Sequence, residues 1–387
     1  MTGTVTPSTA SGSAMNEVLD IIDVDIHERP NSSAELVPYL DDKFRRYLVE
    51  CNWTPERHRP HSQLTVGGVN RADAIPSDGT PAGSDLSLMT HQVLDAYDET
   101  YAVLTGWVNY NASAMSPAWP EFKTALMSAY NDWQIAAFLE KDSRLLGSIH
   151  VNAHDPAGAV REIERLAEHP RMVQVMIYMG DVAFGEPYYH PIYETAQRHG
   201  LVVAFHHGAN SPTALGYHRY YVEWHTLAPQ VFMSELVSLI FNGVFDKYPD
   251  LKVLMVEGGF TYVPHLMWRM DQNYRQLRIE VPWLKREPSR IIREQVRFAT
   301  QPIEELTAEQ LLQVIDQMGS DKLLCFSSDY PHWDFDSAFE ALPDRIPADL
   351  RRRIMSENAR SLYRSLAPRQ DRAGVRAGGI QIGGEAP

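Results

Sequence analysis

The chain has 387 residues and a formal net charge of −15 at pH 7, from 50 acidic and 35 basic residues. The basic residues are scattered rather than gathered into a stripe, which argues against a phosphate backbone as a partner, so we expect no binding to nucleic acid. No apolar run approaches the ~20 residues that a membrane-spanning helix needs, and we expect no membrane association.

Both ends of the chain have the composition of disordered tails. Residues 1–17 are rich in Ser, Thr, Gly and Ala, and residues 367–387 are rich in Gly. The N-terminus lacks the basic start and the apolar segment of a signal peptide, and Cys51 and Cys325 lie in unlike contexts that favour reduced thiols. We therefore expect a cytoplasmic protein with one catalytic domain over residues 18–366.

Between the tails, short apolar runs alternate with helix-length amphipathic segments, which is typical of βα units around a parallel sheet. The candidate helices include residues 121–141, 156–168 and 188–199. Eight candidate strands span residues 20–26, 101–107, 145–151, 172–178, 201–206, 252–257, 296–300 and 322–328. This pattern predicts an α/β fold of the (β/α)8 TIM-barrel type.

Residues 28–90 interrupt this rhythm directly after the first strand. The segment is rich in Pro, Gly and Ser and is too long for a simple connection. We expect this insertion to cover the mouth of the barrel.

Acidic and histidine side chains stand at four predicted strand ends, where a TIM barrel carries its chemistry. Asp25 and His27 are spaced by two at the end of the first strand, so their side chains should project to the same side. His206 and His207 end the fifth strand, where alternation should let only one of them point inward.

Two further carboxylates complete this pattern. Glu257 ends the sixth strand in VLMVEGG, and Asp329 ends the eighth in CFSSDYPHWD, with His332 one turn beyond it. Taken singly, each has a plain alternative: an acid can cap a loop or pair with an arginine, and a histidine can be a satisfied core residue. Together they would converge in a closed barrel, and converging carboxylates need a cation to offset their repulsion.

We therefore assign Asp25, His27, His206 and Asp329 as metal ligands, with Glu257 as a further ligand or bridge. His225, in YYVEWHTLAPQ, could overhang the same mouth as a second-metal ligand or proton-handling group, or be a partly buried surface histidine.

Other residues nearby have secondary roles in this hypothesis. His207 and His332 would orient ligands or line the pocket, Glu28 would be structural, and Gln174 stands where a metal-bridging lysine would be sought. The aromatic residues that could wall a pocket for a small organic molecule are Trp107, Tyr178, Tyr217, Tyr220, Tyr221, Trp224 and Trp333.

The order D-x-H, FHHG, GVFDKYPDLKVLMVEGG and SSDYPHWD resembles the amidohydrolase superfamily, in the branch of aminocarboxymuconate-semialdehyde decarboxylase-like proteins. The resemblance spans about residues 20–365 and implies a distorted (β/α)8 barrel with a divalent metal at the strand ends. By position, His27 matches the second histidine of the family's H-x-H pair, His206 the fifth-strand ligand, and Asp329 the eighth-strand aspartate.

Two residues depart from that family pattern. Asp25 replaces the first histidine of H-x-H, and Glu257 replaces a histidine that assists catalysis in the decarboxylases. The more oxygen-rich site favours Fe or Mn over Zn, as one ion or two. The pattern thereby resembles a subgroup that includes non-haem dinuclear Fe/Fe or Mn/Fe monooxygenases.

Three functional hypotheses follow. We rank first a dinuclear monooxygenase that uses O2 to hydroxylate a small organic acid or biosynthetic intermediate. The alternative is a mononuclear decarboxylase or hydrolase of a carboxylated substrate, with Glu257 or Asp329 taking the proton. The third is a non-catalytic partner subunit. The resemblance also implies a homo-oligomer, or a hetero-oligomer with a related subunit.

Overall fold

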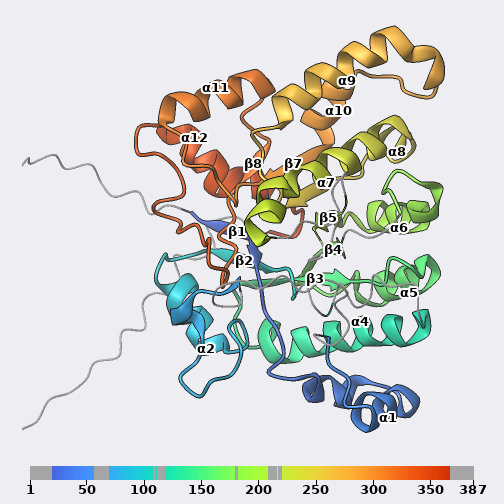
Figure 1. Ribbon diagram of the computed structural model, residues 1–387, viewed down its shortest axis with the longest axis vertical. Helices are drawn as coiled ribbons and strands as arrows, with labels where there is room; N and C mark the ends of the chain where they lie inside the picture. The colour runs from blue at the N-terminus through green and yellow to red at the C-terminus, as the bar shows by residue number, and fades with distance from the viewer. Residues whose placement is uncertain are drawn as a thin grey trace, which may run out of the picture.

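The computed structural model describes residues 20–55, 69–107, 110, 119–178, 182–207, 216 and 220–366. Within these residues, eight parallel strands form one sheet in chain order, with helices packed around it (Figure 1). The strands are β1 (Ile22–Ile26), β2 (Tyr101–Leu104), β3 (Leu145–His150), β4 (Met172–Tyr178), β5 (Val202–His206), β6 (Val253–Val256), β7 (Val296–Ala299) and β8 (Leu324–Cys325). Each predicted strand is present, so the (β/α)8 barrel is confirmed. The tails predicted at 1–17 and 367–387 lie outside the described residues.

The barrel closes through backbone hydrogen bonds between β1 and the segment after β8. The N–H of Val24 donates to the carbonyl of Phe326 over 3.0 Å, and that of His27 to the carbonyl of Tyr330 over 2.7 Å. In the opposite direction, the N–H of Asp329 donates to the carbonyl of Asp25 over 3.0 Å. The two segments with the outermost predicted ligands are therefore bonded to each other.

The strands are buried on both faces, because helices cover the outside of the barrel and side chains fill the inside. All seven residues of β4 and all five of β5 are buried. This explains why these strands read in the sequence as continuous apolar runs rather than as alternating patterns.

Most helices return the chain between strands. They are α4 (Pro120–Gln134), which continues as the π-helical η6 (Ile135–Leu139), α5 (Pro156–Leu166), α6 (His190–His199), α7 (Tyr221–Phe241), α8 (Val244–Lys247), α9 (Val263–Leu277), α10 (Pro288–Gln295), α11 (Ala308–Met318), α12 (Ala348–Arg352) and α13 (Asn358–Leu362). Two helix boundaries have the capping residues that the sequence predicts. The Asp155 carboxylate accepts the N–H of Gly158 over 2.9 Å at the start of α5. Gly200 ends α6 with φ 69°. Among the described residues, none of the helices combines the length and apolar composition needed to cross a bilayer.

The described parts of the insertion contain η1 (Ser33–Tyr39), α1 (Asp42–Glu50), η4 (Ala72–Ala74) and α2 (Leu86–Met89). η1 packs against α4 and α1 against η1, while the later part of the insertion contacts the C-terminal end of the barrel. A Cβ atom at Gly83 would lie 2.6 Å from the carbonyl oxygen of His27, so only glycine allows this close approach. The N–H of Arg71 also donates to the carbonyl of Pro331 over 2.9 Å.

Candidate metal centre

Five of the six residues predicted for the metal site lie together at the C-terminal ends of the strands. Asp25 belongs to β1 and His27 directly follows it, His206 ends β5, Glu257 directly follows β6, and Asp329 follows β8. Each of them is at most 6% exposed. Closure of the sheet brings together residues separated by up to about three hundred positions in the chain.

The imidazole of His27 is held with one nitrogen aimed at two carboxylates. Its Nδ1 lies 2.6 Å from the carbonyl of Gly106, and because a carbonyl only accepts, Nδ1 carries the proton. Its Nε2 lies 2.9 Å from Asp329 Oδ1 and 3.4 Å from Asp25 Oδ1. A lone pair facing two carboxylates is repulsive, so a cation, either a proton or a metal ion, is required between them.

His206 repeats this arrangement on the other side of the centre. Its Nδ1 donates to the carbonyl of His207 over 2.7 Å, and its Nε2 lies 2.8 Å from Glu257 Oε2. The Nε2 of His207 lies 2.8 Å from the same oxygen. The expectation that only one of these histidines points inward is wrong, because β5 ends at His206 and strand alternation does not extend to the next residue.

The centre leaves a set of buried polar atoms without hydrogen-bond partners. These atoms are Asp25 Oδ2, His27 Nε2, His206 Nε2, both ring nitrogens of His207, Glu257 Oε2 and Asp329 Oδ2. Unpaired buried polar atoms are costly, and here they are concentrated at one place.

The spacing of these atoms fits a metal ion. Three overlapping groups have ligand atoms within 4.8 Å of one another: His27, Glu257, Asp329 and His332; Asp25, His27 and His206; and His206, His207 and Glu257. With metal–ligand bonds of about 2.1 Å, two adjacent ligands at right angles are about 3 Å apart, which matches the contacts above. The residues therefore fit a divalent cation held by imidazole and carboxylate groups.

The pKa values of the carboxyl groups show how strongly this centre favours positive charge. Burial raises the pKa of Asp25 to about 6, although His27 opposes it. Burial and the neighbouring Glu257 raise the pKa of Asp329 well above its usual range. For Glu257, burial acts in the same direction, but the imidazoles of His207 and His206 outweigh it and lower the pKa. A divalent cation would allow all three groups to be ionised together.

Two of the carboxylates stand on backbone that non-glycine residues rarely adopt. Glu257 and Asp329 both have φ of 60°. The left-handed region costs a non-glycine residue about 1–2 kcal/mol, and such residues gather at functional sites. Glu257 comes directly after β6 and Asp329 four residues after β8, and both carboxylates are aimed at imidazoles.

Comparison with known proteins identifies the family of the chain. The profile of the family described as Amidohydrolase matches residues 22–365. The chain belongs to this family. Family membership and the donor set together identify a metal-dependent enzyme on the amidohydrolase fold.

Its amidohydrolase relatives include decarboxylases. A gamma-resorcylate decarboxylase of Polaromonas sp. is 24% identical over 254 residues, which are 60% of this chain and 74% of the relative. A crystal structure of 5-carboxyvanillate decarboxylase from Sphingomonas paucimobilis matches with a TM-score of 0.63 and 19% identity, over 89% of this chain and 99% of that one. A dihydroxybenzoic acid decarboxylase from Polaromonas sp., with bound manganese and the inhibitor 2-nitroresorcinol, matches with a TM-score of 0.63 and 18% identity over 89% and 97%.

These solved structures establish the shared fold. None of the three relatives is an oxygenase, so the resemblance to the monooxygenase subgroup stays a prediction.

The sixth predicted residue of the amidohydrolase site, His225, lies outside the three donor groups. It belongs to α7, and its Nε2 lies 3.2 Å from Asp334 Oδ2. Glu28 is buried and accepts the N–H of Gly106 over 3.0 Å, a structural role as expected. Gln174 donates to Ser148 Oγ over 2.8 Å, so the position where a bridging lysine was sought is part of a hydrogen-bond network inside the barrel.

Most of the predicted aromatic wall packs on the site histidines. Ring centroids are 6.1 Å apart for Trp107 and His27, 4.7 Å for Tyr178 and His206, 4.8 Å for Trp224 and His207, and 5.5 and 5.7 Å for His225 with Tyr221 and Trp333. Tyr220 is 56% exposed, and Tyr217 lies outside the described residues.

Two residues that position the ligands were not singled out from the sequence. Thr105 donates its hydroxyl proton to Asp25 Oδ1 over 2.6 Å, and the carbonyl of Gly106 fixes the His27 ring. Both directly follow β2, and the polar side chain of Thr105 near the end of the second predicted strand was a signal in the sequence that could have identified it. His332 Nδ1 lies 2.7 Å from Asp329 Oδ1, in the orienting position expected for it.

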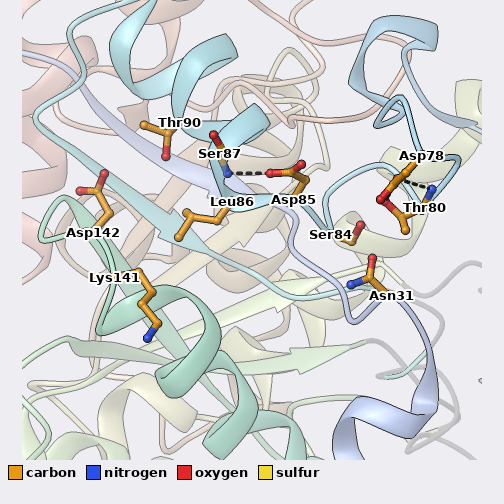
Figure 2. A pocket seen from close by; sticks show the side chains of 10 residues that line it. All are labelled: Asn31, Asp78, Thr80, Ser84, Asp85, Leu86, Ser87, Thr90, Lys141 and Asp142. Carbon is orange, nitrogen blue, oxygen red and sulfur yellow. Dashed lines mark hydrogen bonds between the residues drawn. The ribbon is translucent and has the colours of Figure 1, made fainter.

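A cavity of about 650 Å³ lies apart from the metal centre, between the insertion and the turn before β3 (Figure 2). Its carboxylates serve local structure. Asp78 accepts from Thr80, Asp85 caps α2 through the N–H groups of Ser87 and Leu88, and Asp142 pairs with Arg144. This cavity therefore carries no donor set comparable to that at the strand ends.

Proposed function

We propose that this amidohydrolase is a metal-dependent decarboxylase that removes CO2 from a small carboxylated aromatic compound. The observation that carries the proposal is the convergence of unpaired, buried donor atoms from Asp25, His27, His206, Glu257 and Asp329. The named activities of its relatives, all on hydroxylated benzoic acids, support this choice of reaction and substrate class.

The residues of the metal site would have different roles in this reaction. Asp25, His27, His206 and Asp329 would hold the ion, and Glu257 would add a further ligand. A bound divalent cation would supply positive charge that attracts and polarises an anionic substrate. Thr105 and the Gly106 carbonyl would keep Asp25 and His27 in position, as groups around a metal site commonly do.

The aromatic wall suits a ring-bearing substrate. Trp107 is 3% exposed and Tyr178 is 2% exposed, and both rings contact site histidines. The rings of Tyr221 and Trp333 reach the same end of the barrel, and the indole N–H of Trp333 donates to the Tyr221 hydroxyl over 3.4 Å. Such walls favour a flat organic molecule over a peptide or a phosphate ester.

The test is anaerobic CO2 release by the full chain loaded with Mn²⁺, with 2,6-dihydroxybenzoate and 5-carboxyvanillate as the probes. We expect turnover without O2, and its loss in His27→Ala. The surface variant His199→Gln, which changes a histidine paired with Glu164 at 2.9 Å, should keep full activity. Absence of CO2 release from both probes by metal-loaded wild-type protein would contradict the assignment.

A dinuclear oxygenase is the second candidate, and the size of the donor set favours it. The three groups include Asp25, Glu257, Asp329 and four histidines, which is more than one ion commonly takes from protein. Two ions could divide these ligands. Two equivalents of iron or manganese per chain, together with substrate-dependent O2 consumption, would replace the decarboxylase assignment with this one.

A further inference from the structure

His225 and Asp334 form a second pair of ionisable side chains at the same end of the barrel. His225 lies near the start of α7, and Asp334 lies after β8, beyond the segment that carries Asp329 and His332. Their Nε2 and Oδ2 atoms are 3.2 Å apart, with side-chain exposures of 18% and 14%. The two residues are 109 positions apart in the chain, so this contact exists only in the folded barrel.

The carboxylate of Asp334 is itself held in place. The side-chain amide of Gln301, which follows β7 and is fully buried, donates to Asp334 Oδ2 over 2.9 Å and to its carbonyl over 3.3 Å. The backbone N–H of Gln301 is fixed in turn by Ser327 Oγ at 2.9 Å. An acid oriented in this way holds the histidine's tautomer and ring direction, as the acid does in acid–histidine pairs of enzymes.

Two aromatic residues pack against the imidazole ring of His225. Tyr221 stacks on one side, with centroids 5.5 Å apart and planes at 27°, and Trp333 lies on another side at 5.7 Å. Nε2 faces Asp334, while Nδ1 has no hydrogen bond to any residue the structure describes and is not among the buried unpartnered atoms. Nδ1 is therefore the ring nitrogen that can meet a substrate or water.

The electrostatic surroundings favour a protonated ring. Burial lowers the pKa of His225, but the hydrogen bond and charge of Asp334, together with the carboxylates of Glu257 and Asp329, outweigh burial and raise it. The ring also lies beside the metal centre, because the Trp224 ring separates it from His207, with centroids 6.3 Å from His225 and 4.8 Å from His207.

The four imidazoles of the donor groups face carboxylates of the same groups. His27 and His206 donate through Nδ1 to backbone carbonyls and face the donor set with Nε2. His207 faces Glu257, and His332 faces Asp329. His225, by contrast, pairs with an acid that is outside the donor groups.

We propose that His225 donates the proton that replaces the lost carboxylate of the substrate, and that Asp334 is the positioning residue for it. This inference rests on the proposed decarboxylase function. In this step the bond between the ring carbon and the carboxylate carbon breaks and CO2 leaves. The electron pair left on the ring carbon takes the proton from His225 Nδ1, and the neutral imidazole regains a proton from water. Substrate carboxylate and one proton thus give CO2 and a C–H bond.

The main test compares His225→Gln with His199→Gln in the full Mn²⁺-loaded chain, using 2,6-dihydroxybenzoate. His199 is a matched control, because it is also 18% exposed and also pairs with a carboxylate, Glu164, on the barrel exterior. General acid catalysis contributes about 10²–10⁴-fold, so kcat should fall by that factor in His225→Gln while KM and metal content stay unchanged. His199→Gln should match wild type in all three.

Asp334→Asn tests the positioning role through a pH profile. An acid catalyst is active while protonated, so kcat falls as the pH rises through its pKa. Removing the Asp334 charge lowers the pKa of His225. The fall in kcat with rising pH should therefore occur at lower pH in Asp334→Asn and be absent in His225→Gln. In Zn²⁺-loaded protein, NMR of the His225 imidazole should show the same shift without any turnover.

The possible results of these experiments distinguish the role of His225 from the decarboxylase function. If wild type releases CO2 and His225→Gln has the same kcat and the same fall in kcat with rising pH, the role of His225 is wrong while the decarboxylase function stands. Loss of a metal equivalent in His225→Gln would also overturn it, because His225 would then be a ligand. If metal-loaded wild type releases no CO2 but consumes O2 with substrate, both claims fall.

Discussion

At the scale of single residues, Glu257 is where the decarboxylase and oxygenase hypotheses differ most. One oxygen of its carboxylate lies 2.8 Å from two imidazole nitrogens, those of His206 and His207. Its backbone is in the left-handed region with φ of 60°, directly after β6. Such a carboxylate contributes negative charge that a metal ion can use and that a histidine at this position would not supply.

Replacing Glu257 by Gln should therefore cost metal binding more than folding. The amide keeps the size of the side chain but removes its charge, so we expect metal affinity to fall by at least about 10–100-fold, the loss that is typical when a group that only orients a metal ligand is changed. Elemental analysis after dialysis measures this. The melting temperature of the metal-free protein should stay close to that of metal-free wild type.

Glu168→Gln serves as the control for that variant, because its side chain is 92% exposed and distant from the centre. Full metal content together with full activity in Glu257→Gln would refute the assignment of Glu257 as a ligand.

Much of the site was predictable because strand-end position and side-chain type both show in the sequence. Asp25 and His27 are spaced by two at the end of the first strand, and Glu257 and Asp329 each end a predicted strand. The joint approach of His206 and His207 to Glu257 was not, because it depends on where β5 stops. Nor was the pairing of His225 with Asp334, since no local pattern relates residues that only the closed barrel brings together.

At the scale of elements, the strands were predictable in number and place but not in length. The eighth was expected over residues 322–328, yet β8 is only Leu324–Cys325. The next residues bond elsewhere: the N–H of Phe326 donates to the carbonyl of Ile354, and its carbonyl accepts from Val24. A tertiary contact thus ends the ladder where the apolar sequence continues.

Helix α5 offers a test of how its sequence signals act. The carboxylate of Asp155 accepts the N–H of Gly158 over 2.9 Å and the hydroxyl proton of Thr124 over 2.8 Å. Asp155→Ala should lower the free energy of unfolding by about 1–2 kcal/mol, because a helix N-cap is lost. Urea denaturation measures this, and Asp155→Asn, which can still cap, should lose less. Equal losses in the two variants would show that charge rather than capping matters.

Glu235 connects α7 to the segment after β4 and should make stability depend on pH. Its carboxylate accepts the N–H of Phe184 over 2.7 Å, and burial raises its pKa from 4.5 to about 7. A raised carboxyl pKa stabilises the fold below the unfolded value, so this contribution is complete below pH 4.5 and is lost as the pH rises to about 7. One pKa unit corresponds to about 1.4 kcal/mol, so up to about 3 kcal/mol is involved.

Glu235→Gln should remove this dependence, because the amide oxygen can still accept from Phe184 but does not ionise. Denaturation midpoints at pH 5 and pH 7.5 should therefore differ less in the variant than in wild type. An unchanged difference between the two pH values would show that Glu235 does not titrate in this range.

At the scale of the whole molecule, the metal centre lies where the barrel is least continuous. Its ligands come from β1 and β5, from the residues directly after β1 and β6, and from the segment after β8, which itself has only two residues. Between β1 and the segment after β8, closure depends on three backbone hydrogen bonds near Asp25, His27 and Asp329. The donor set therefore joins the first and last strands of the sheet as well as forming the site.

Metal removal should accordingly destabilise the entire barrel. A ligand present at about 1,000 times its Kd stabilises the folded state by about 4 kcal/mol, provided that it does not bind the unfolded chain. Calorimetry of Mn²⁺-loaded protein with and without a chelator should show a melting temperature several degrees lower without metal, given about 2 °C per kcal/mol for larger domains. The metal-free protein should remain folded at 25 °C, because its hydrophobic core is separate from the donor set.

The His27→Ala variant provides the control, since a chelator should hardly change its melting temperature. Equal melting temperatures of wild type with and without chelator, at full initial metal content, would show that the ion contributes to chemistry without closing the barrel.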